Sequence, residues 1–344
     1  MQFCGRCIFC LQNPDSLSGV RYMLNSADLS DRNIISTRSF SRERIDKILS
    51  FAEKLEPVAR KEARCDILDG KVMALLFFEP STRTKMSFET AMIRLGGKVI
   101  NMGSVEASSV AKGETLADTV RVISGYADAI VLRHPREGAA LMASEFASVP
   151  IINAGDGAGH HPTQTLLDLY TIRRESHLDD LTITLAGDLK YGRTVHSLCY
   201  ALSNYGARIN LVSPPELRMP ERILEEMDRR RIEINIFDSL EAAVKDSDIL
   251  YMTRIQRERF PDPAEFSKVS KEMRVTKKLL ENVRPDLKVM HPLPRVDEIL
   301  PEVDSTPHAC YFRQAFYGVP VRMAVLSMAM GIDDIDPETC IRRI

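Results

Sequence analysis

The chain has 344 residues, of which 44% are hydrophobic and 27% charged, and its net charge at pH 7 is −2. This length is enough for two domains with full cores, and the near-neutral charge argues against a broad surface for nucleic acid or for an anionic membrane. No apolar run approaches the ~20 residues that a membrane span needs. We therefore expect neither a nucleic-acid nor a membrane partner, and any strong positive potential should be local.

The first segment, residues 1–30, is expected to be a poorly ordered N-terminal extension. It carries Cys4, Cys7 and Cys10 in a C-x-x-C-x-x-C run, but no nearby fourth ligand completes a tetrahedral metal cage or an iron–sulfur cluster. Its apolar stretch is too short for a signal peptide. A loose extension, or a true start at Met23, is favoured over a metal site. The remaining cysteines lie scattered in apolar or helical stretches, as expected for buried thiols in a reducing cytoplasm.

After this extension the sequence predicts an amphipathic helix over 41–55 and then alternating strands and helices. The strands form two series, predicted at 71–78, 98–102, 129–133 and 149–153, and then at 182–187, 208–212, 233–237, 249–252 and 287–290. The intervening helices are predicted at 114–125, 138–147, 193–204, 220–230 and 239–245. Short Val/Ile/Leu-rich strands separated by helices are typical of parallel sheets with helices on both faces.

The pattern therefore predicts an α/β fold of two domains, each a parallel sheet flanked by helices, with a cleft between them. We assign residues 31–165 to the first domain and 166–312 to the second. A long helical stretch over 162–176 contains no strand and should connect the two. An apolar helix over 321–330, within the C-terminal segment 313–344, is expected to pack back on the first domain.

The most informative local pattern follows the strand at 71–78, where the chain reads Ser81-Thr82-Arg83-Thr84 and then becomes helical. A helix that begins on these residues points backbone N–H groups, hydroxyls and a guanidinium at one spot, which suits a phosphate or a carboxylate. An ordinary N-cap explains Ser81 alone. A cation in the first turn opposes the helix dipole unless an anion is bound. The sequence therefore predicts an anion site here.

Polar residues also end other strands of the first series. Arg133 follows an apolar strand, and in the same sheet it can share the anion site with the residues of the Ser81 turn. His161 and Gln164 lie three residues apart at the start of the connecting helix, so both can face one ligand. Because ligands of open α/β sheets bind at the carboxyl ends of the strands, we expect these groups to converge on one cleft.

The second series carries a comparable set. The run from Gly187 to Thr194 resembles a P-loop, but Arg193 replaces the compact lysine that such a loop folds around, so a carboxylate clamp is the better interpretation. Arg254 and Gln256 lie just past a buried strand. A cis Leu293–Pro294 bond would turn backbone carbonyls toward the cleft.

Taken together and in this order, seven motifs closely resemble the catalytic chains of the aspartate carbamoyltransferase family. They are Ser81-Thr82-Arg83-Thr84, Lys112-Gly113-Glu114-Thr115, Arg133-His134-Pro135, His161-Pro162-Thr163-Gln164, Gly187 to Thr194, Arg254-Ile255-Gln256 and His291-Pro292-Leu293-Pro294. The likeness runs from about Asn33 to Gly331. Ornithine carbamoyltransferases would carry a Cys in the last motif and a Ser-Met-Gly motif, and both are absent here.

The resemblance implies a transcarbamoylase fold, with carbamoyl phosphate bound by the first domain and L-aspartate by the second. The reaction would give N-carbamoyl-L-aspartate and phosphate, the second step of de novo pyrimidine (UMP) biosynthesis, in the cytoplasm. It implies no cofactor, no metal and no covalent intermediate. Both substrates are polyanions, which agrees with the arginine-rich cleft that the sequence patterns predict.

The resemblance also gives each matched residue a role. The phosphate would be held by Ser81, Thr82, Arg83, Thr84 and Arg133, and the carbamoyl carbonyl polarised by Thr84, Arg133 and His161. The carbamoyl amide would be bound by Gln164 and the carbonyls of Leu293 and Pro294, and the aspartate carboxylates by Arg193, Arg254 and Gln256. Ser108 and Lys112 would reach in from a neighbouring subunit, with Lys112 also contacting aspartate, so the homotrimer would share its active sites. Glu79 would pair with Arg193 and Arg259 when the cleft shuts.

Two other functions stay open at this point. A pseudo-enzyme or binding module on the same fold would lose site residues, whereas every matched position here holds the expected residue. An unrelated phosphate-binding α/β enzyme, such as a phosphotransferase, would require Mg²⁺, while the transferase should be fully active in excess chelator. Separate regulatory chains are a further partner that the family allows and the sequence does not decide.

Overall fold

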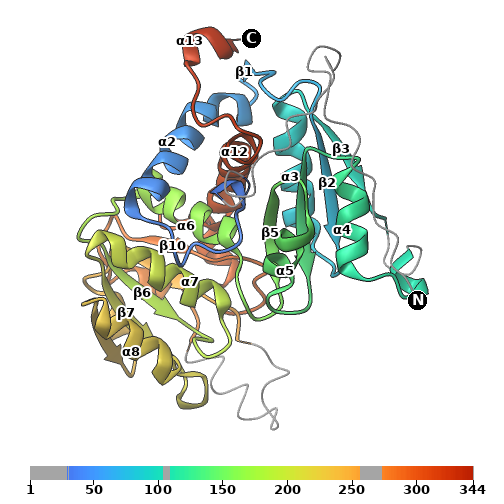
Figure 1. The fold of residues 1–344 in the computed structure, drawn as a ribbon. Coiled ribbons are helices and arrows are strands. Elements are labelled where there is room, and N and C mark those ends of the chain that lie inside the picture. Colours follow the sequence, from blue (N-terminus) through green and yellow to red (C-terminus); the bar gives the residue numbers. More distant parts are fainter. Residues whose placement is uncertain (1–28, 30, 104–108, 256–272, 344) are drawn as a thin grey trace, which may run out of the picture.

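The computed structural model describes residues 29, 31–103, 109–255 and 273–343, which form two lobes, each built on a parallel sheet with helices packed against it (Figure 1). The strand order is β3-β2-β4-β5 in the first sheet and β10-β9-β6-β7-β8 in the second. All strand pairs inside these two sheets are parallel. The predicted α/β architecture with two sheets is therefore confirmed.

The first lobe follows the predicted order of elements closely. Its strands are β2 (Val72–Phe77), β3 (Lys98–Asn101), β4 (Ala129–His134) and β5 (Ile151–Asp156). Its helices are α2 (Arg42–Ala59), α3 (Thr82–Arg94), α4 (Leu116–Ser124) and α5 (Ala139–Phe146), with a 3₁₀ turn at Ser109–Lys112. The strand predicted at 149–153 begins later and ends later than expected, because Pro150 precedes it and the pairing with β4 continues to Asp156.

The second lobe also contains every strand predicted for it. These strands are β6 (Thr182–Ala186), β7 (Arg208–Val212), β8 (Glu233–Phe237), β9 (Ile249–Met252) and β10 (Lys288–Met290). Its helices are α7 (Arg193–Leu202), α8 (Glu221–Arg229), α9 (Leu240–Val244) and α11 (Lys277–Leu280), with 3₁₀ turns at Ser203–Tyr205, Pro215–Leu217 and Pro301–Ser305.

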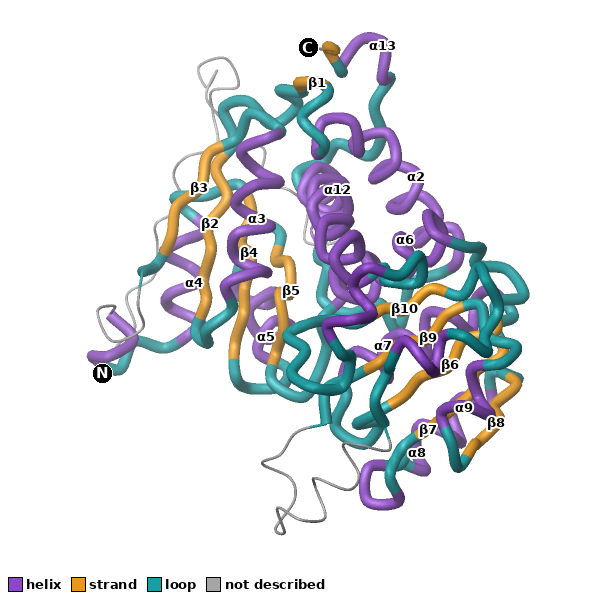
Figure 2. Tube along the Cα trace, turned by 180° about the vertical axis from the view of Figure 1, so that it is seen from behind, coloured by secondary structure: helices purple, strands orange, loops and turns teal. Residues whose placement is uncertain are grey.

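Two long helices run between the lobes, α6 (Pro162–Glu175) and α12 (Tyr311–Ala329), seen side by side from both directions (Figures 1 and 2). The predicted helix over 321–330 is wrong at its start, since α12 begins at Tyr311 and runs through Pro320. Beyond it lie α13 (Pro337–Cys340) and β11 (Arg342–Arg343), which pairs antiparallel with β1 (Ala63–Arg64). No helix in the described ranges is long and apolar enough to span a membrane.

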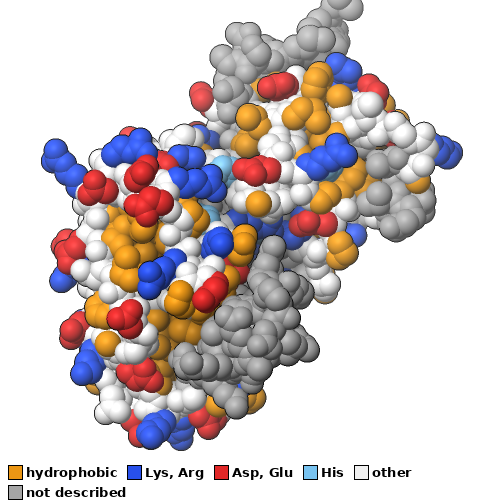
Figure 3. Space-filling view, turned by 90° about the horizontal axis from the view of Figure 1, so that it is seen from below, with side chains coloured by type: hydrophobic (Ala, Val, Ile, Leu, Met, Phe, Trp, Pro, Cys, Tyr) orange, Lys and Arg blue, Asp and Glu red, His pale blue; other side chains and the backbone are white. Residues whose placement is uncertain are grey.

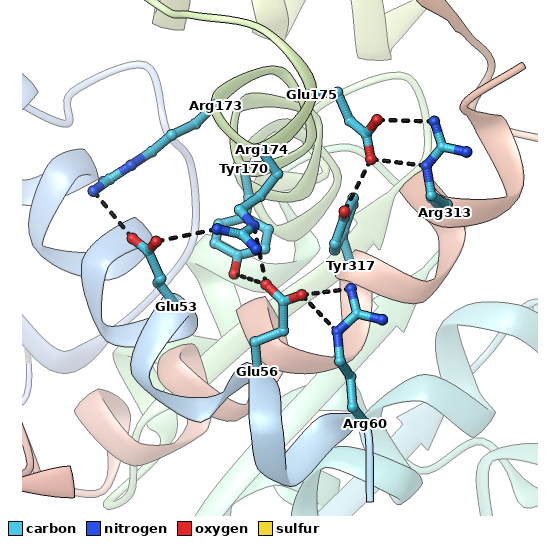
Figure 4. A network of polar contacts seen from close by, with 9 residues as sticks. All are labelled: Glu53, Glu56, Arg60, Tyr170, Arg173, Arg174, Glu175, Arg313 and Tyr317. Atoms are coloured by element: carbon cyan, nitrogen blue, oxygen red, sulfur yellow. Dashed lines mark hydrogen bonds and ion pairs between the residues drawn. The ribbon is translucent and has the colours of Figure 1, made fainter. Parts of the chain in front are cut away.

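A polar network ties these two helices to the first lobe (Figure 4). The buried carboxylate of Glu56 on α2 accepts a hydrogen bond of 2.6 Å from Tyr170 on α6. Glu175, at the end of α6, accepts bonds of 2.8 Å from Arg313 and 2.9 Å from Tyr317, both on α12. α12 also packs along α2 and α3. The connecting helices therefore hold a fixed position against α2, from which they can carry side chains into the space between the lobes.

Candidate functional site

A cavity of about 410 Å³ lies where the two lobes meet, at the carboxyl ends of β2, β4 and β10. Lys and Arg side chains gather in this waist between the lobes in the view from below (Figure 3). The lining residues are Pro80, Ser81, Thr82, Arg83, Thr84, Ser87, Arg133, His161, Gln164, Leu167, Arg193, Thr194, His291, Pro292, Leu293, Pro294, Gln314, Ala315 and Arg322. Four of these side chains are guanidinium groups, so the cavity suits an anion.

The N-terminus of α3 forms one wall, and its polar groups are open to a ligand. Ser81 is the N-cap residue, but its side chain makes no capping hydrogen bond, and the first turn contains no acidic residue. Neither the N-cap side chain nor an acidic residue of the first turn therefore compensates the helix dipole, while Arg83 adds positive charge at the same end. This geometry matches an anion site rather than an ordinary N-cap.

Arg133, the next-to-last residue of β4, is held over the cavity by its neighbours. Its Nη1 donates to the carbonyl of Ala154 at 2.9 Å, and its Nη2 lies 2.5 Å from Oε1 of Glu79. Its side chain is only 12% exposed, and burial lowers its pKa, an effect that Glu79 opposes and Arg193 reinforces. Its Nε is buried without a partner among the described residues. The guanidinium thus keeps a donor free in a nearly dry position.

Gly155 on β5 permits this arrangement. Its φ of +121° lies in a region that favours glycine, and a Cβ atom there would lie 2.7 Å from Nη1 of Arg133 and 3.3 Å from Nη2 of Arg193. Both guanidinium groups therefore pack against bare backbone at one point of the sheet.

His161 and Gln164 enter the cavity from the first turn of α6. His161 is 6% exposed, and its Nδ1 has no hydrogen-bond partner in the described parts of the chain. Burial, reinforced by Arg193, Arg322 and Arg133, lowers its pKa well below the ordinary value. The imidazole is therefore neutral at physiological pH.

A second cavity of about 700 Å³ adjoins the first and shares Arg193, Thr194 and Pro292 with it. Arg193 begins α7 and donates to the carbonyl of Gly157 on the opposite lobe, and burial lowers its pKa. Arg254, just past β9, lines the same cavity. Two neighbouring cavities, each with arginines and with Arg193 in common, form a site for two anionic ligands side by side.

The loop after β10 closes the first cavity. The Leu293–Pro294 peptide bond is cis, the case considered from the sequence, and both residues line the cavity. The loop is held by His291, whose Nδ1 accepts a bond of 2.8 Å from the N–H of Leu293 and whose Nε2 lies 2.7 Å from the buried carboxylate of Glu298.

The structure thus brings most of the predicted site residues to one place. The first cavity is lined by Ser81, Thr82, Arg83, Thr84, Arg133, His161, Gln164, Arg193, Leu293 and Pro294, and the second by Glu79, Arg193 and Arg254. Lys112 lines neither cavity and is exposed. Ser108, Gln256, Arg259, Cys4, Cys7 and Cys10 lie outside the described residues. In this state Glu79 pairs with Arg133, while Arg193 contacts Gly157.

Sequence reasoning missed a buried polar group at the back of the first cavity. Arg322 on α12 is 3% exposed, donates to Ser87 at 2.9 Å and lies 5.1 Å from the ring centroid of Phe88. Burial lowers its pKa to about 10. The signal was a single arginine inside an otherwise apolar helical stretch. Asp168 and Gln314 were missed as well.

Two family models match the chain in succession. Residues 32–174 match the carbamoyl-phosphate-binding domain of aspartate/ornithine carbamoyltransferases. Residues 179–329 match the Asp/Orn-binding domain of the same family.

Individual relatives give the same result. The aspartate carbamoyltransferase catalytic subunit of Methanosarcina acetivorans is 67% identical over 302 residues, which cover 88% of this chain and 98% of that one. The catalytic subunit of M. jannaschii aspartate transcarbamoylase superposes with a TM-score of 0.83 at 53% identity, covering 87% of this chain and 97% of that one. The aspartate transcarbamoylase of Trypanosoma cruzi, in complex with carbamoyl phosphate and aspartate, gives a TM-score of 0.81 at 42% identity and covers 88% and 98%.

Proposed function

Because the chain belongs to the aspartate/ornithine carbamoyltransferase family, we propose that it transfers the carbamoyl group of carbamoyl phosphate to the amine of L-aspartate. The products are N-carbamoyl-L-aspartate and phosphate, and the step belongs to pyrimidine biosynthesis. The observation that carries this proposal is the pair of adjoining arginine-lined cavities that share Arg193. Aspartate rather than ornithine is the acceptor, because the second cavity offers Arg193 and Arg254 to carboxylates and the high-identity relatives are aspartate enzymes.

In the proposed mechanism the phosphate lies at the N-terminus of α3, between the Ser81–Thr84 turn and Arg133. The uncapped helix end and the free Nε of Arg133 support this position. The carbamoyl carbonyl faces Thr84, Arg133 and His161. His161 is neutral, so it carries a single ring N–H. This group donates a hydrogen bond to the developing oxyanion and does not transfer a proton to it.

The aspartate carboxylates bind Arg193 and Arg254 in the second cavity, with Gln256 assigned there by the family resemblance. This holds the amine against the carbamoyl carbon. The amine nitrogen forms a bond to that carbon, the bond to the phosphate oxygen breaks, and the departing phosphate accepts the amine proton. Catalysis then consists mainly of orientation and electrostatic stabilisation.

The shared active site is supported by the position of Lys112 and by exposed apolar side chains on the first lobe. Lys112 is exposed and lines neither cavity of its own chain. Elsewhere on the same lobe, Met86 and Ile93 on α3 are 59% and 64% exposed, and Ile100 on β3 is exposed too. Exposed apolar side chains of this size favour a contact with another subunit. We therefore propose a homotrimer in which Lys112 and Ser108 complete a neighbour's site.

Three further assignments belong to this proposal. The domain division at 31–165 and 166–312, with 313–344 returning to the first domain, is supported by the packing of α12 on α2 and α3. A cytoplasmic location is supported by the free, buried thiols of Cys65, Cys199 and Cys310. Separate regulatory chains remain a partner to be tested by native mass of the purified assembly.

The test is an assay of the purified full chain with carbamoyl phosphate and either L-aspartate or L-ornithine, each with and without excess EDTA. We expect carbamoyl-aspartate, little or no citrulline, and equal rates with and without chelator. Ornithine as the better acceptor would refute the substrate assignment, and loss of activity in EDTA would favour a metal-dependent reaction.

A further inference from the structure

Behind Gln164, the wall of the first cavity contains a buried carboxylate that the proposed mechanism does not use. Asp168, one turn further along α6, is 0% exposed. Its Oδ1 accepts hydrogen bonds from Nε2 of Gln164 at 2.9 Å and from Nε2 of Gln314 at 2.7 Å. Its Oδ2 accepts a bond of 2.8 Å from the hydroxyl of Tyr251 on β9. Three elements, α6, α12 and β9, therefore meet at one side chain.

The direction of these hydrogen bonds is fixed by a backbone group. The N–H of His291 donates to Oε1 of Gln314 at 2.8 Å. A backbone N–H can only donate, so the oxygen of the Gln314 amide must face it and the amide nitrogen must face Asp168. Oδ1 of Asp168 therefore acts as an acceptor for Gln314.

The acceptor role of Asp168 also fixes the orientation of the Gln164 amide. With Oδ1 of Asp168 accepting, the Gln164 amide presents its nitrogen to the carboxylate, so its oxygen is left for the cavity that Gln164 lines. An oxygen there accepts hydrogen bonds and has none to give. Gln164 can therefore recognise an N–H group on a ligand, whereas a methyl group in the same place leaves that acceptor unpaired.

This polarity does not depend on the charge of Asp168. Burial raises its pKa to about 7, against hydrogen bonds from Gln314, Tyr251 and Gln164 that lower it. When the carboxyl carries a proton, that proton can lie on Oδ2, where the Tyr251 hydroxyl can accept it. Oδ1, with two N–H donors, remains an acceptor in both states.

We infer that Asp168 and Gln314 are positioning residues that hold Gln164 with its acceptor toward the cavity and so select a carbamoyl group over an acyl group. The inference rests on the proposed function, since it concerns the donor substrate of that reaction. The selectivity then depends on a series of hydrogen bonds that runs from the backbone N–H of His291 through Gln314 and Asp168 to Gln164. His291 also accepts a bond from the Leu293 N–H, so this series connects the opposite wall of the cavity with α6.

The experiment compares two stable ligands that differ only in this group. Phosphonoacetamide carries the amide, and acetonylphosphonate carries a methyl in its place. Binding of each, and of inorganic phosphate, is measured by isothermal titration calorimetry on the full-length wild type and on Asp168→Leu, Asp168→Asn and Tyr251→Phe. Asp168→Leu removes the acceptor at similar volume, while Asp168→Asn keeps an oxygen that the two glutamines can share.

We expect the wild type to bind phosphonoacetamide more tightly than acetonylphosphonate. In Asp168→Leu the ratio of the two dissociation constants should shrink about 10-fold, the effect of losing one hydrogen bond in a buried cavity. Inorganic phosphate should bind within about 3-fold of wild type, which a general loss of structure would not allow. Asp168→Asn and Tyr251→Phe should keep the preference, because neither removes the acceptor at the Oδ1 position.

Several outcomes would overturn the inference. One is an Asp168→Leu protein that keeps the wild-type preference, and another is an Asp168→Asn protein that loses it, which would assign the effect to charge. Where Asp168→Leu does not fold, Gln314→Leu replaces it, with a smaller loss of preference expected and an unchanged preference counting against the idea. A wild type that binds both ligands equally would also overturn the inference, whereas a wild type that forms no carbamoyl-aspartate would refute the proposed function.

Discussion

Gly155→Ala is a sharp test of the shared arginine site, because one methyl group is aimed at two guanidinium groups. The new Cβ would lie 2.7 Å from Nη1 of Arg133, which must withdraw to at least the 3.4 Å of an ordinary contact, and 3.3 Å from Nη2 of Arg193. That withdrawal pulls on the bonds of Arg133 to Ala154 and Glu79. A displacement approaching 1 Å at a substrate-binding group costs about 10²-fold in rate. We expect kcat/KM to fall by about that factor.

The substitution also strains the backbone, so a matched control is needed. Alanine at a positive φ costs on the order of 1–3 kcal/mol of folding free energy. Gly70 has a φ of +74° and nothing within 4 Å of its Cβ position, so Gly70→Ala carries backbone strain without the clash. Thermal unfolding and steady-state kinetics of both variants separate the two effects. A folded Gly155→Ala enzyme with the kcat/KM of Gly70→Ala would refute the account of how Arg133 and Arg193 are positioned.

The remaining predictions concern single groups. Arg133→Ala should lower kcat by about 10² or more, roughly 3 kcal/mol of transition-state stabilisation, with nearly unchanged unfolding; wild-type turnover removes Arg133 from the mechanism. Glu79→Ala should raise the KM for aspartate about 10-fold or more and the KM for carbamoyl phosphate far less. An equal rise in both KM values would mean that Glu79 acts only through its ion pair with Arg133. Subunit exchange between inactive Lys112→Ala and Arg83→Ala trimers should restore activity, and verified mixed trimers without activity would contradict the shared site. Because burial depresses the pKa of His161 in the folded state, the stability it contributes is present above pH 6.5 and lost as the pH falls below it. Urea denaturation at pH 7.5 and 6.0 should show a larger loss in the wild type than in His161→Gln, which keeps the lowered pKa values of His134 and His196; equal losses would contradict this.

The clustering of Ser81 to Thr84 at one wall of the cavity could be predicted from the sequence because these residues are local. Ser81 to Thr84 follow one apolar strand and open one helix, so strand and helix periodicity alone place them together. The helix α12 was harder, since only its apolar part at 321–330 was predicted. The helix in fact runs through Pro320, and its burial between α2, α3 and α6 compensates for the missing N–H. Gln314 lies in the part of α12 that was therefore missed.

The polar chain behind Gln164 could not be found by the same reasoning. Asp168 and Gln314 are 146 residues apart in the sequence, and each is an unremarkable polar residue on its own helix. Only the crossing of α6 and α12 brings them together, and that crossing is fixed by distant contacts such as those of Glu56 and Glu175 (Figure 4). Local patterns predict which residues line the cavity, while the groups that orient these residues depend on the packing of the whole chain.

The central claim, that the chain joins a carbamoyl carbon to the amine nitrogen of aspartate, can be tested directly by NMR. The purified chain is incubated with ¹³C-labelled carbamoyl phosphate and ¹⁵N-labelled L-aspartate, and the product is followed by ¹³C spectroscopy. The account predicts a new ureido carbon that shows one-bond coupling to ¹⁵N and grows as inorganic phosphate appears. Release of phosphate with the ¹³C label in bicarbonate, and no coupled carbon, would contradict it.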